Sequence, residues 1–144
     1  MKIKLKKLNA DAHIPTFGSE YSAGADLYSI DGDVTLNPGC SYLFHTGISL
    51  EIPKGYAGLI FARSSLACKK GIAPSNKVGV IDSDYRGEIM VSLFNQSKES
   101  VVIEKGERIA QLVITPFLSC EYEEAEELSD TVRGEGGFGS TGRK

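Results

Sequence analysis

Short runs of alternating or β-branched apolar residues recur along almost the whole chain. They lie at residues 3–8, 34–36, 41–52, 57–62, 78–81, 88–95, 101–103 and 109–116. Clusters of Asp, Asn, Pro and Gly separate them, at 31–33, 37–39, 53–55, 84–87 and 104–106, and these residue types favour tight turns. Short strands at this spacing are typical of an all-β sandwich or barrel, so we expect an all-β fold.

Only two segments have helical character. Ser64 to Lys70 predicts a short helix of about two turns with a serine as its N-cap. Residues 122–128 are acidic and form either one helical turn or an irregular, solvated linker. This division predicts a β-rich core over residues 1–128 and a flexible Gly-rich C-terminal lid over residues 129–144.

Composition narrows the class of protein. A chain of 144 residues with 41% apolar residues fits one compact domain. The net charge of −3, from 16 basic and 19 acidic side chains, argues against direct nucleic-acid binding through a basic surface. Cys40, Cys68 and Cys120 have neither disulfide-framework nor zinc-site spacing. With no apolar run of membrane-spanning length, we expect a soluble, cytoplasmic protein with no membrane association.

The segment from Arg133 to Gly142 contains five glycines but is not of random composition. Its glycines permit close approach of the backbone to a ligand, Arg133 supplies a charge, Phe138 a stacking face, and Ser140 and Thr141 supply hydroxyl donors. This is the inventory of a lid for a nucleoside polyphosphate. The alternative is an ordinary disordered C-terminus.

The segment from Gly79 to Ile89 is a strand entering a turn that holds two carboxylates, a phenol and a guanidinium. A carboxylate at a strand end, such as Asp82, can orient a water molecule or a sugar hydroxyl, and Tyr85 can cover one side of that ligand. The simpler interpretation is a hairpin turn in which Asp and Gly serve only the backbone.

Polar residues at three further places are candidates for phosphate chemistry. Arg63 and Ser64 stand at a predicted junction of a strand and a helix, where backbone N–H groups favour an anion, although a serine cap beside a surface arginine explains them equally. Gln111 interrupts an apolar strand, so its amide must meet a backbone group or a ligand. Asp26 precedes an apolar run and is either functional or a turn aspartate. His13 and His45 have no neighbouring ligand pattern, and we assign both a structural role.

Together and in this order, five segments resemble the five motifs of the trimeric deoxyuridine triphosphatases. They are residues 23–27, 63–67, 79–87, 106–113 and 133–142, and the resemblance spans nearly the whole chain. It implies a homotrimer of jelly-roll, β-clip-like sandwiches with one short helix and a flexible C-terminal tail. It also implies Mg²⁺-dependent hydrolysis of dUTP to dUMP and pyrophosphate, in sites that combine more than one subunit, which limits uracil incorporation into DNA and supplies dUMP for thymidylate synthesis.

The resemblance assigns roles to individual positions. Asp82 is similar to the general base that directs water at the α-phosphate, and Tyr85 to the ring beneath the sugar that leaves no space for a ribose 2′-hydroxyl. Gln111 and Asp26 join Asp82 in the implied catalytic set, and Asp26 would hold the water shell of Mg²⁺ rather than the ion itself. The implied uracil-reading positions are Asn76, Gly79, Val80, Ile81 and Met90. The implied phosphate and lid contacts are Arg63, Ser64, Ser65, Gln111, Arg133, Phe138, Gly139, Ser140 and Thr141.

The chain departs from the usual pattern of that family at Ala62, often proline, and at Ser65, often glycine. Residues 63–67 are also similar to the related dCTP deaminases. In those enzymes a catalytic glutamate aligns with Ser92, which cannot replace it, so deamination is the weaker alternative. A third hypothesis is a dUTP-sensing module that acts on a protein partner through its lid.

Overall fold

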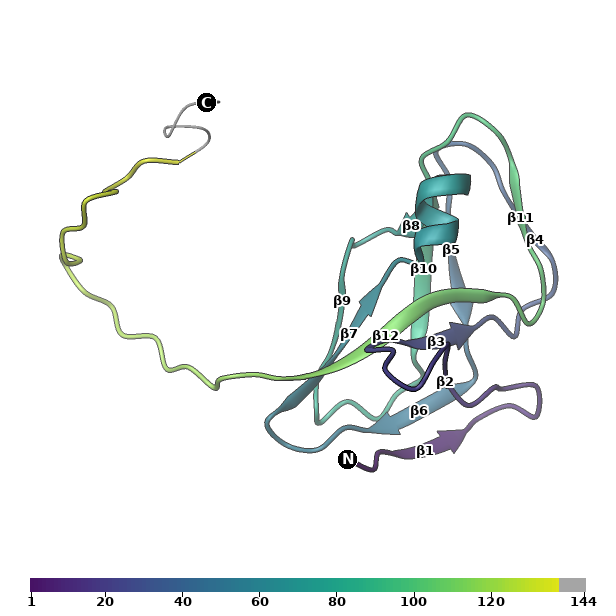
Figure 1. Cartoon of the computed structure of the whole chain (residues 1–144), viewed down its shortest axis with the longest axis horizontal. Coiled ribbons are helices and arrows are strands. Elements are labelled where there is room, and N and C mark those ends of the chain that lie inside the picture. The colour runs from purple at the N-terminus through teal and green to yellow at the C-terminus, as the bar shows by residue number, and fades with distance from the viewer. Residues whose placement is uncertain (138–144) are drawn as a thin grey trace.

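A computed structural model describes residues 1–137 of the chain, and this part is almost entirely β-structure (Figure 1). The elements in chain order are β1 (Lys4–Lys7), β2 (Thr16–Phe17), β3 (Ala25–Tyr28), β4 (Val34–Leu36), β5 (Ser41–His45), β6 (Ile48–Glu51), β7 (Tyr56–Phe61), η1 (Ser65–Lys70), β8 (Ile72–Pro74), β9 (Gly79–Ile81), β10 (Met90–Asn95), β11 (Val101–Ile103) and β12 (Arg108–Pro116). The prediction of an all-β sandwich with one short helix is confirmed.

The strands form four antiparallel groups. The largest sheet has the order β2-β3-β12-β7-β9, and a three-stranded sheet has the order β5-β10-β8. The pairs β1-β6 and β4-β11 extend the two ends of the body (Figure 1). Sequential strands therefore often belong to different sheets. One of the segments that cross between sheets, from β9 to β10, contains Asp82 and Tyr85.

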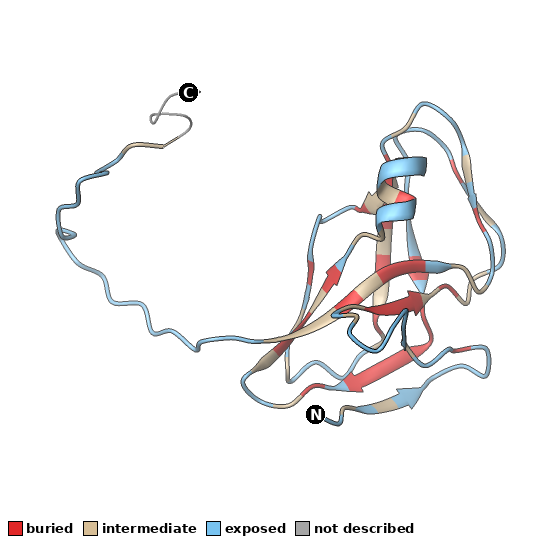
Figure 2. Cartoon of the chain, viewed as in Figure 1, coloured by how far each residue is buried: buried red, intermediate tan, exposed pale blue. Residues whose placement is uncertain are grey.

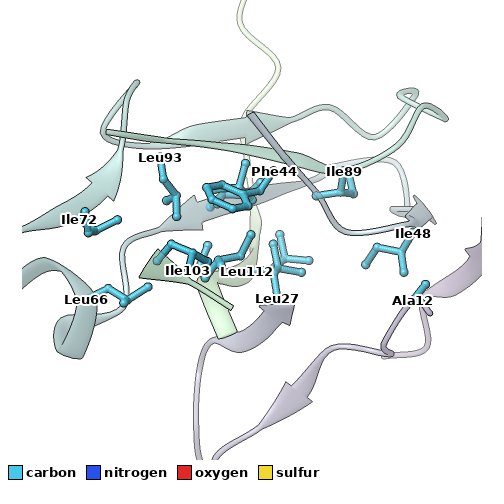
Figure 3. Packing of buried hydrophobic residues seen from close by; sticks show 14 of the residues in the cluster. Ala12, Leu27, Phe44, Ile48, Leu66, Ile72, Ile89, Leu93, Ile103 and Leu112 are labelled. Atoms are coloured by element: carbon cyan, nitrogen blue, oxygen red, sulfur yellow. The ribbon is translucent and has the colours of Figure 1, made fainter. Parts of the chain in front are cut away.

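A single apolar cluster fills the space between the sheets. Alternate residues of β10 point inward, as its buried Val91, Leu93 and Asn95 illustrate. Phe44 from β5 and Leu27 from β3 meet these residues near the centre of the cluster (Figure 3). Each buried Leu, Ile or Phe side chain stabilises the fold by about 1.5–3 kcal/mol, so this cluster is the main support of the sheets.

The predicted strand over residues 41–52 is wrong at one point, because the chain turns a corner at Thr46 and Gly47 between β5 and β6. Gly47 has a φ of +67°, which side chains of L-residues disfavour. A Cβ atom there would lie 2.9 Å from Ile30 Cδ1 and 3.0 Å from Ala12 Cβ. The corner carries the chain from the three-stranded sheet to the β1-β6 pair.

The other differences concern short or fully buried elements. β3 was not predicted as a strand because Ala25, Asp26 and Leu27 are all buried, which removes the alternation expected of a half-exposed strand. β2 has only two residues, and β8 has three and ends in a proline, so neither carries a periodic signal. Ser64 precedes η1 as predicted, but the expected cap is wrong because its side chain makes no capping hydrogen bond.

Beyond β12 the chain leaves the body as an extended segment (Figure 1). Residues 116–135 are exposed throughout, and the acidic stretch over residues 122–128 is irregular, which is one of the two predicted outcomes (Figure 2). Within residues 1–137, no helix has the length and apolar character needed to cross a membrane.

Candidate functional site

The segment that links β9 to β10 crosses from one sheet to the other. β9 is the edge strand of the five-stranded sheet and pairs there with β7, whereas β10 pairs with β5 and β8. In the described part of the chain the two strands therefore have no ladder between them. Because β9 is an edge strand, the backbone groups on its outer edge are left for a flat polar ligand, which they can bind as a neighbouring strand would.

A pocket of about 240 Å³ lies at this crossing. Its lining residues are Leu43, Val80, Ile81, Asp82, Tyr85, Glu88 and Met90. The aliphatic side chains supply flat apolar walls, and Val80 is 61% exposed although it belongs to a strand. The pocket thus combines apolar surface with the carboxylates of Asp82 and Glu88 and the phenol of Tyr85, and four predicted site residues besides Asp82 lie together in it.

Local contacts hold the Tyr85 ring in place. Its hydroxyl donates a hydrogen bond to the backbone carbonyl of Glu88 at 3.0 Å. A Cβ atom at position 87 would collide with the ring, so glycine is needed there for the space it leaves. Arg86 closes the turn by donating from Nη1 to the carbonyl oxygens of Ser83 (2.7 Å) and Tyr85 (2.8 Å).

A second group of polar residues gathers around Asp26 on β3. Arg63, just after β7, donates from Nε to Asp26 Oδ1 at 2.9 Å, and Arg108 of β12 donates from Nη1 to Oδ2 at 3.1 Å. Arg63 also donates from Nη1 to the backbone carbonyl of Arg108 at 3.1 Å. Asp26 is 4% exposed, so its carboxylate is a buried anchor that fixes two guanidinium groups.

Gln111 belongs to this second group. It lies opposite Asp26 and opposite Phe61 in the strand register, and directly opposite residues project to the same face of a sheet. Its side chain packs against Gly24, where a Cβ atom would lie 3.2 Å from Gln111 Cβ. Among residues 1–137 no hydrogen-bond partner of the Gln111 amide is found, so this half-buried amide and the uncapped Ser64 hydroxyl are open to a ligand.

The predicted site residues thus form two groups in this chain, around the β9–β10 pocket and around Asp26. Ser65 is exposed at the start of η1, beside the second group, and Asn76 Nδ2 lies 3.5 Å from the position that a Cβ atom on Gly79 would occupy. Arg133 donates from Nε to the carbonyl oxygen of Gly136 at 2.8 Å, in the exposed tail. Phe138, Gly139, Ser140 and Thr141 lie outside the described residues.

Sequence reasoning missed Arg108, Leu43 and Glu88. Arg108 stood inside a recognised segment, but only the fold reveals that it meets a carboxylate 82 residues earlier in the chain. Leu43 reads as an ordinary strand residue, and Glu88 as the first residue of a strand. No local pattern marks any of the three, because each owes its place to pairing between distant strands.

Two of the described polar residues could take part in binding a metal ion. Among residues 1–137, no three His, Cys, Asp or Glu side chains gather at a spacing suited to a metal. Asp26 and Gln111 nevertheless offer carboxylate and amide oxygens side by side, the ligand types that Mg²⁺ and its bound water prefer. These two residues would hold a hydrated Mg²⁺ through water.

Comparisons with known proteins identify the class. The family model described as dUTPase matches residues 10–142. The deoxyuridine 5′-triphosphate nucleotidohydrolase of Nautilia profundicola is 54% identical over 143 residues, covering 99% of this chain and 100% of that protein. The dUTPase of Staphylococcus bacteriophage 80alpha with dUPNHPP matches with a TM-score of 0.89 and 32% identity over 98% of both chains. A D95N mutant dUTPase from phage phi11 of S. aureus, described with a structural Mg(II) ion, matches with a TM-score of 0.78 and 25% identity over 88% of this chain and 98% of that one.

The structure is an all-β sandwich with a pocket between two diverging strands. A buried carboxylate elsewhere in the large sheet binds two arginine side chains. The chain belongs to the dUTPase family of enzymes. The resemblance inferred from five short segments is therefore confirmed.

Replacing Asp26 with Asn should destabilise the fold, because it removes the charge that compensates two guanidinium groups, one of them only 17% exposed. Breaking a buried ion pair in this way lowers the free energy of unfolding by about 3 kcal/mol. Denaturant unfolding at fixed protein concentration measures the change. Asp11→Asn is the matched control, because Asp11 pairs with Lys105 at 2.7 Å but both side chains are about half exposed, and we expect little change there. Equal effects of the two substitutions would contradict the anchoring role of Asp26.

Proposed function

We propose that this chain is a Mg²⁺-dependent dUTPase that hydrolyses dUTP to dUMP and pyrophosphate. The observation that carries the proposal is the β9–β10 pocket, in which Asp82 and Tyr85 lie together in a member of this family. In the cell this activity would limit uracil incorporation into DNA and supply dUMP for thymidylate synthesis.

Deoxyuridine would occupy the β9–β10 pocket. The open backbone edge of β9 can read the donors and acceptors of uracil, and the apolar side chains of the pocket can cover its faces. Tyr85 would lie beneath the deoxyribose. Because the Tyr85 hydroxyl is hydrogen-bonded to the Glu88 carbonyl, in a position for which Gly87 leaves room, the ring would not easily withdraw to admit a 2′-hydroxyl.

Asp82 would act as the general base. Its exposed carboxylate stands at the rim of the pocket, where the phosphate chain of a bound nucleotide would begin. There it would accept a proton from a water molecule whose oxygen attacks the α-phosphorus, while the bond to the pyrophosphate oxygen breaks. Arg63, Ser64 and Gln111 would stabilise the charge that moves onto the leaving pyrophosphate.

When bound with the triphosphate, Mg²⁺ would supply charge neutralisation at the phosphate oxygens. Asp26 and Gln111 would orient its bound water, and Asp26 would do so while continuing to fix Arg63. A carboxylate oxygen has two lone pairs, so both roles are compatible.

Each complete site would combine two or more copies of the chain in a homotrimer. At about 240 Å³, the pocket is smaller than the roughly 300 Å³ at which pockets for drug-sized ligands begin, so it can hold only part of a nucleotide. The phosphate-binding group around Asp26 lines no part of that pocket within residues 1–137. We therefore place the β9–β10 pocket of one copy beside the Asp26 group of its neighbour.

Apolar surface on the described chain favours such an assembly. A groove of about 450 Å³ is lined almost entirely by apolar side chains, among them Ile3, Ile14, Phe17 and Ile114. The extended segment after β12 exposes further apolar residues, with Leu118 at 88%. Contiguous apolar surface of this kind marks a protein interface.

The C-terminal tail would act as the lid. Residues 129–144 form the Gly-rich unit, and Phe138 would stack over uracil while Arg133, Ser140 and Thr141 grip the γ-phosphate. In the described part of this unit residues 129–135 are exposed, and the segment runs clear of the core sheets (Figure 2). Its closure would therefore depend on the triphosphate itself.

Deamination of dCTP has less support. At the position where the deaminases carry a glutamate, the hydroxyl of Ser92 pairs with Ser75 Oγ at 2.8 Å. A hydroxyl in this arrangement cannot serve as the carboxylate of a deaminase.

The decisive assay offers purified protein dUTP, dCTP, dTTP and UTP with Mg²⁺ and identifies the products. We expect dUMP and pyrophosphate from dUTP and little turnover of the others. Uridine nucleotides formed from dCTP would indicate the deaminase, and tight dUTP binding without turnover would indicate a sensing module.

Asp82→Asn should lower kcat by at least about 10²-fold with dUTP binding largely kept, as general-base catalysis predicts.

Mixing two inactive variants should restore activity if copies share sites. The first variant is Asp82→Asn. The second is Ser64→Ala with Gln111→Ala, which removes two proposed hydrogen-bond donors to phosphate without touching the Asp26 ion pairs. After joint unfolding and refolding, roughly half of the subunits have an intact β9–β10 pocket, and the other half have an intact set of phosphate-contacting side chains. A shared site needs one of each, so about a quarter of the sites, and of the wild-type rate, should return. A mixture as inactive as its components would place each site within one chain.

Deleting residues from 133 onward should abolish most turnover and leave the thermal midpoint nearly unchanged. The reason is that none of the described residues of this segment belongs to the apolar core. Calorimetry and steady-state kinetics on the truncated and full chains give the comparison. A large drop in the thermal midpoint would instead make the tail a structural element.

A further inference from the structure

Several hydrogen bonds join the β5–β6 corner and the first residues of β6 to residues 86–89, which lie between the pocket turn and β10. Ser49 Oγ donates to the Arg86 carbonyl at 2.7 Å, and Ile89 N donates to the carbonyl of Ile48 at 2.8 Å. Gly47 N donates to Glu88 Oε1 at 2.8 Å. The pocket's return segment, residues 86–89, is thus positioned by the corner rather than by its own turn alone.

One bond at this corner involves a titratable side chain. His45, the last residue of β5, places Nδ1 2.9 Å from Glu88 Oε2. The two Glu88 oxygens are therefore both engaged, one by His45 and one by the Gly47 N–H. His45 is about half exposed, and Glu88 is more buried, with 22% of its side chain exposed.

The surroundings of His45 favour its charged form. The hydrogen bond that the His45 ring donates to the Glu88 carboxylate raises the pKa of His45 above its ordinary value, and the negative charges of Glu88 and Asp31 add to this, while partial burial opposes it. For Glu88, partial burial works to raise the pKa, but hydrogen bonds from His45 and from Gly47 outweigh it and the pKa is lowered. Glu88 is therefore ionised over the range in which His45 titrates.

Asp31 and Glu88 are the titratable groups that face His45. The small pocket beside it, about 290 Å³, is otherwise lined by Leu8, Asn9, Ile30 and Gly47. On the neighbouring strand β10 the residue opposite His45 is Met90. Asp31 accepts a hydrogen bond from the backbone N–H of His45 at 3.0 Å, so its carboxylate is fixed whatever the charge of the ring.

Glu88 connects this corner to the nucleotide pocket. Its side chain lines the pocket, and its backbone carbonyl accepts the hydrogen bond from the Tyr85 hydroxyl. A continuous path therefore runs from the His45 ring through Glu88 to the phenol of Tyr85. Loosening Glu88 at one end would loosen the ring at the other.

We propose that His45 and Glu88 are positioning residues for Tyr85, and that the charge of His45 sets how strictly the pocket rejects a ribose. This inference rests on the proposed function, since it concerns the discrimination of dUTP from UTP. Neither residue acts as a catalytic group. With His45 protonated, the ion pair holds Glu88 and keeps Tyr85 against the sugar, whereas neutral His45 leaves Glu88 held mainly by Gly47.

The sign of the pH dependence follows from the direction of the shift. His45 has a raised pKa, so its contribution is complete at low pH and is lost as pH rises through that raised value. Discrimination is therefore highest near about pH 6 and falls toward about pH 8.5. Since a partly exposed ion pair stabilises a structure only modestly, we expect the preference for dUTP over UTP to change by about fivefold across this range.

The experiment measures the ratio of kcat/KM for dUTP to kcat/KM for UTP across this pH range. Both nucleotides carry the same base and triphosphate, so titration of the substrate cancels in the ratio. His45→Gln should give a low and pH-independent ratio, because the amide keeps a donor but no titrating charge. His13→Gln is the matched control: His13 stacks on Tyr28, with ring centroids 4.9 Å apart, and lies outside the path, so its ratio should follow that of the wild type.

A double-mutant cycle tests whether the effect passes through the phenol. In a Tyr85→Phe background, which lacks the hydroxyl that Glu88 binds, His45→Gln should cause no further change in the ratio at about pH 6. Glu88→Gln should lower the ratio in the native background, and thermal midpoints of all variants verify folding.

The outcomes separate this inference from the proposed function. A wild-type ratio that does not change with pH, or a fall that persists unchanged in His45→Gln, overturns the inference while dUTP hydrolysis stands. An effect of His45→Gln of full size in the Tyr85→Phe background also overturns it. Absence of dUTP hydrolysis in the wild type overturns the proposed function, and the inference with it.

Discussion

The divergence of β9 and β10 is the constraint on which the rest of the site depends. β9 is held by β7 in one sheet and β10 by β5 in another, so the segment between them must cross the gap. The two strands of a hairpin would ordinarily pair and satisfy each other's backbone groups. Here β9 instead keeps one edge without a strand partner among the described residues, beside the pocket. By keeping the two sheets apart, the core leaves this edge open to a ligand.

Because no strand fills the pocket, its lining residues are held in place by contacts with neighbouring segments. The Glu88 carbonyl holds the Tyr85 hydroxyl, and Gly87 leaves room for the ring. Residues 86–89 are held in turn by hydrogen bonds to residues 46–49, and the corner there depends on Gly47, whose positive φ and tight surroundings admit no side chain. A small backbone feature far from the turn in sequence thus supports the segment that positions the Tyr85 ring.

The sequence predicted those parts of the fold that have local signals. The runs at 34–36 and 101–103 match β4 and β11, because each is a short β-branched strand between turns. β3 gave no such signal, since all its central residues are buried. Thr46 and Gly47 were read as part of one strand because a single glycine in an apolar run does not reveal its φ angle.

Some residues of the site could likewise be identified from the sequence, and others could not. Asp82 and Tyr85 were identifiable because a turn does not require an aromatic ring, and the order of five segments supplied the family. Arg108 and the partner of His45 were not, because the residues that meet them lie 82 and 43 positions away. Long-range pairing of this kind is a property of the strand register, and no window of sequence contains it.

The arrangement also explains how a small fold can be selective for a large, highly charged nucleotide. Base and sugar require a shaped, rigid pocket, and the core provides it between two sheets. Phosphates require charge and freedom of approach, and under the proposed function these would come from the arginine group on a buried aspartate and from a Gly-rich tail. Because the two requirements conflict within one compact chain of this size, separating them between the copies of the proposed homotrimer would resolve the conflict. A rigid pocket would then remain closed to a ribose while the phosphate side opens for each turnover.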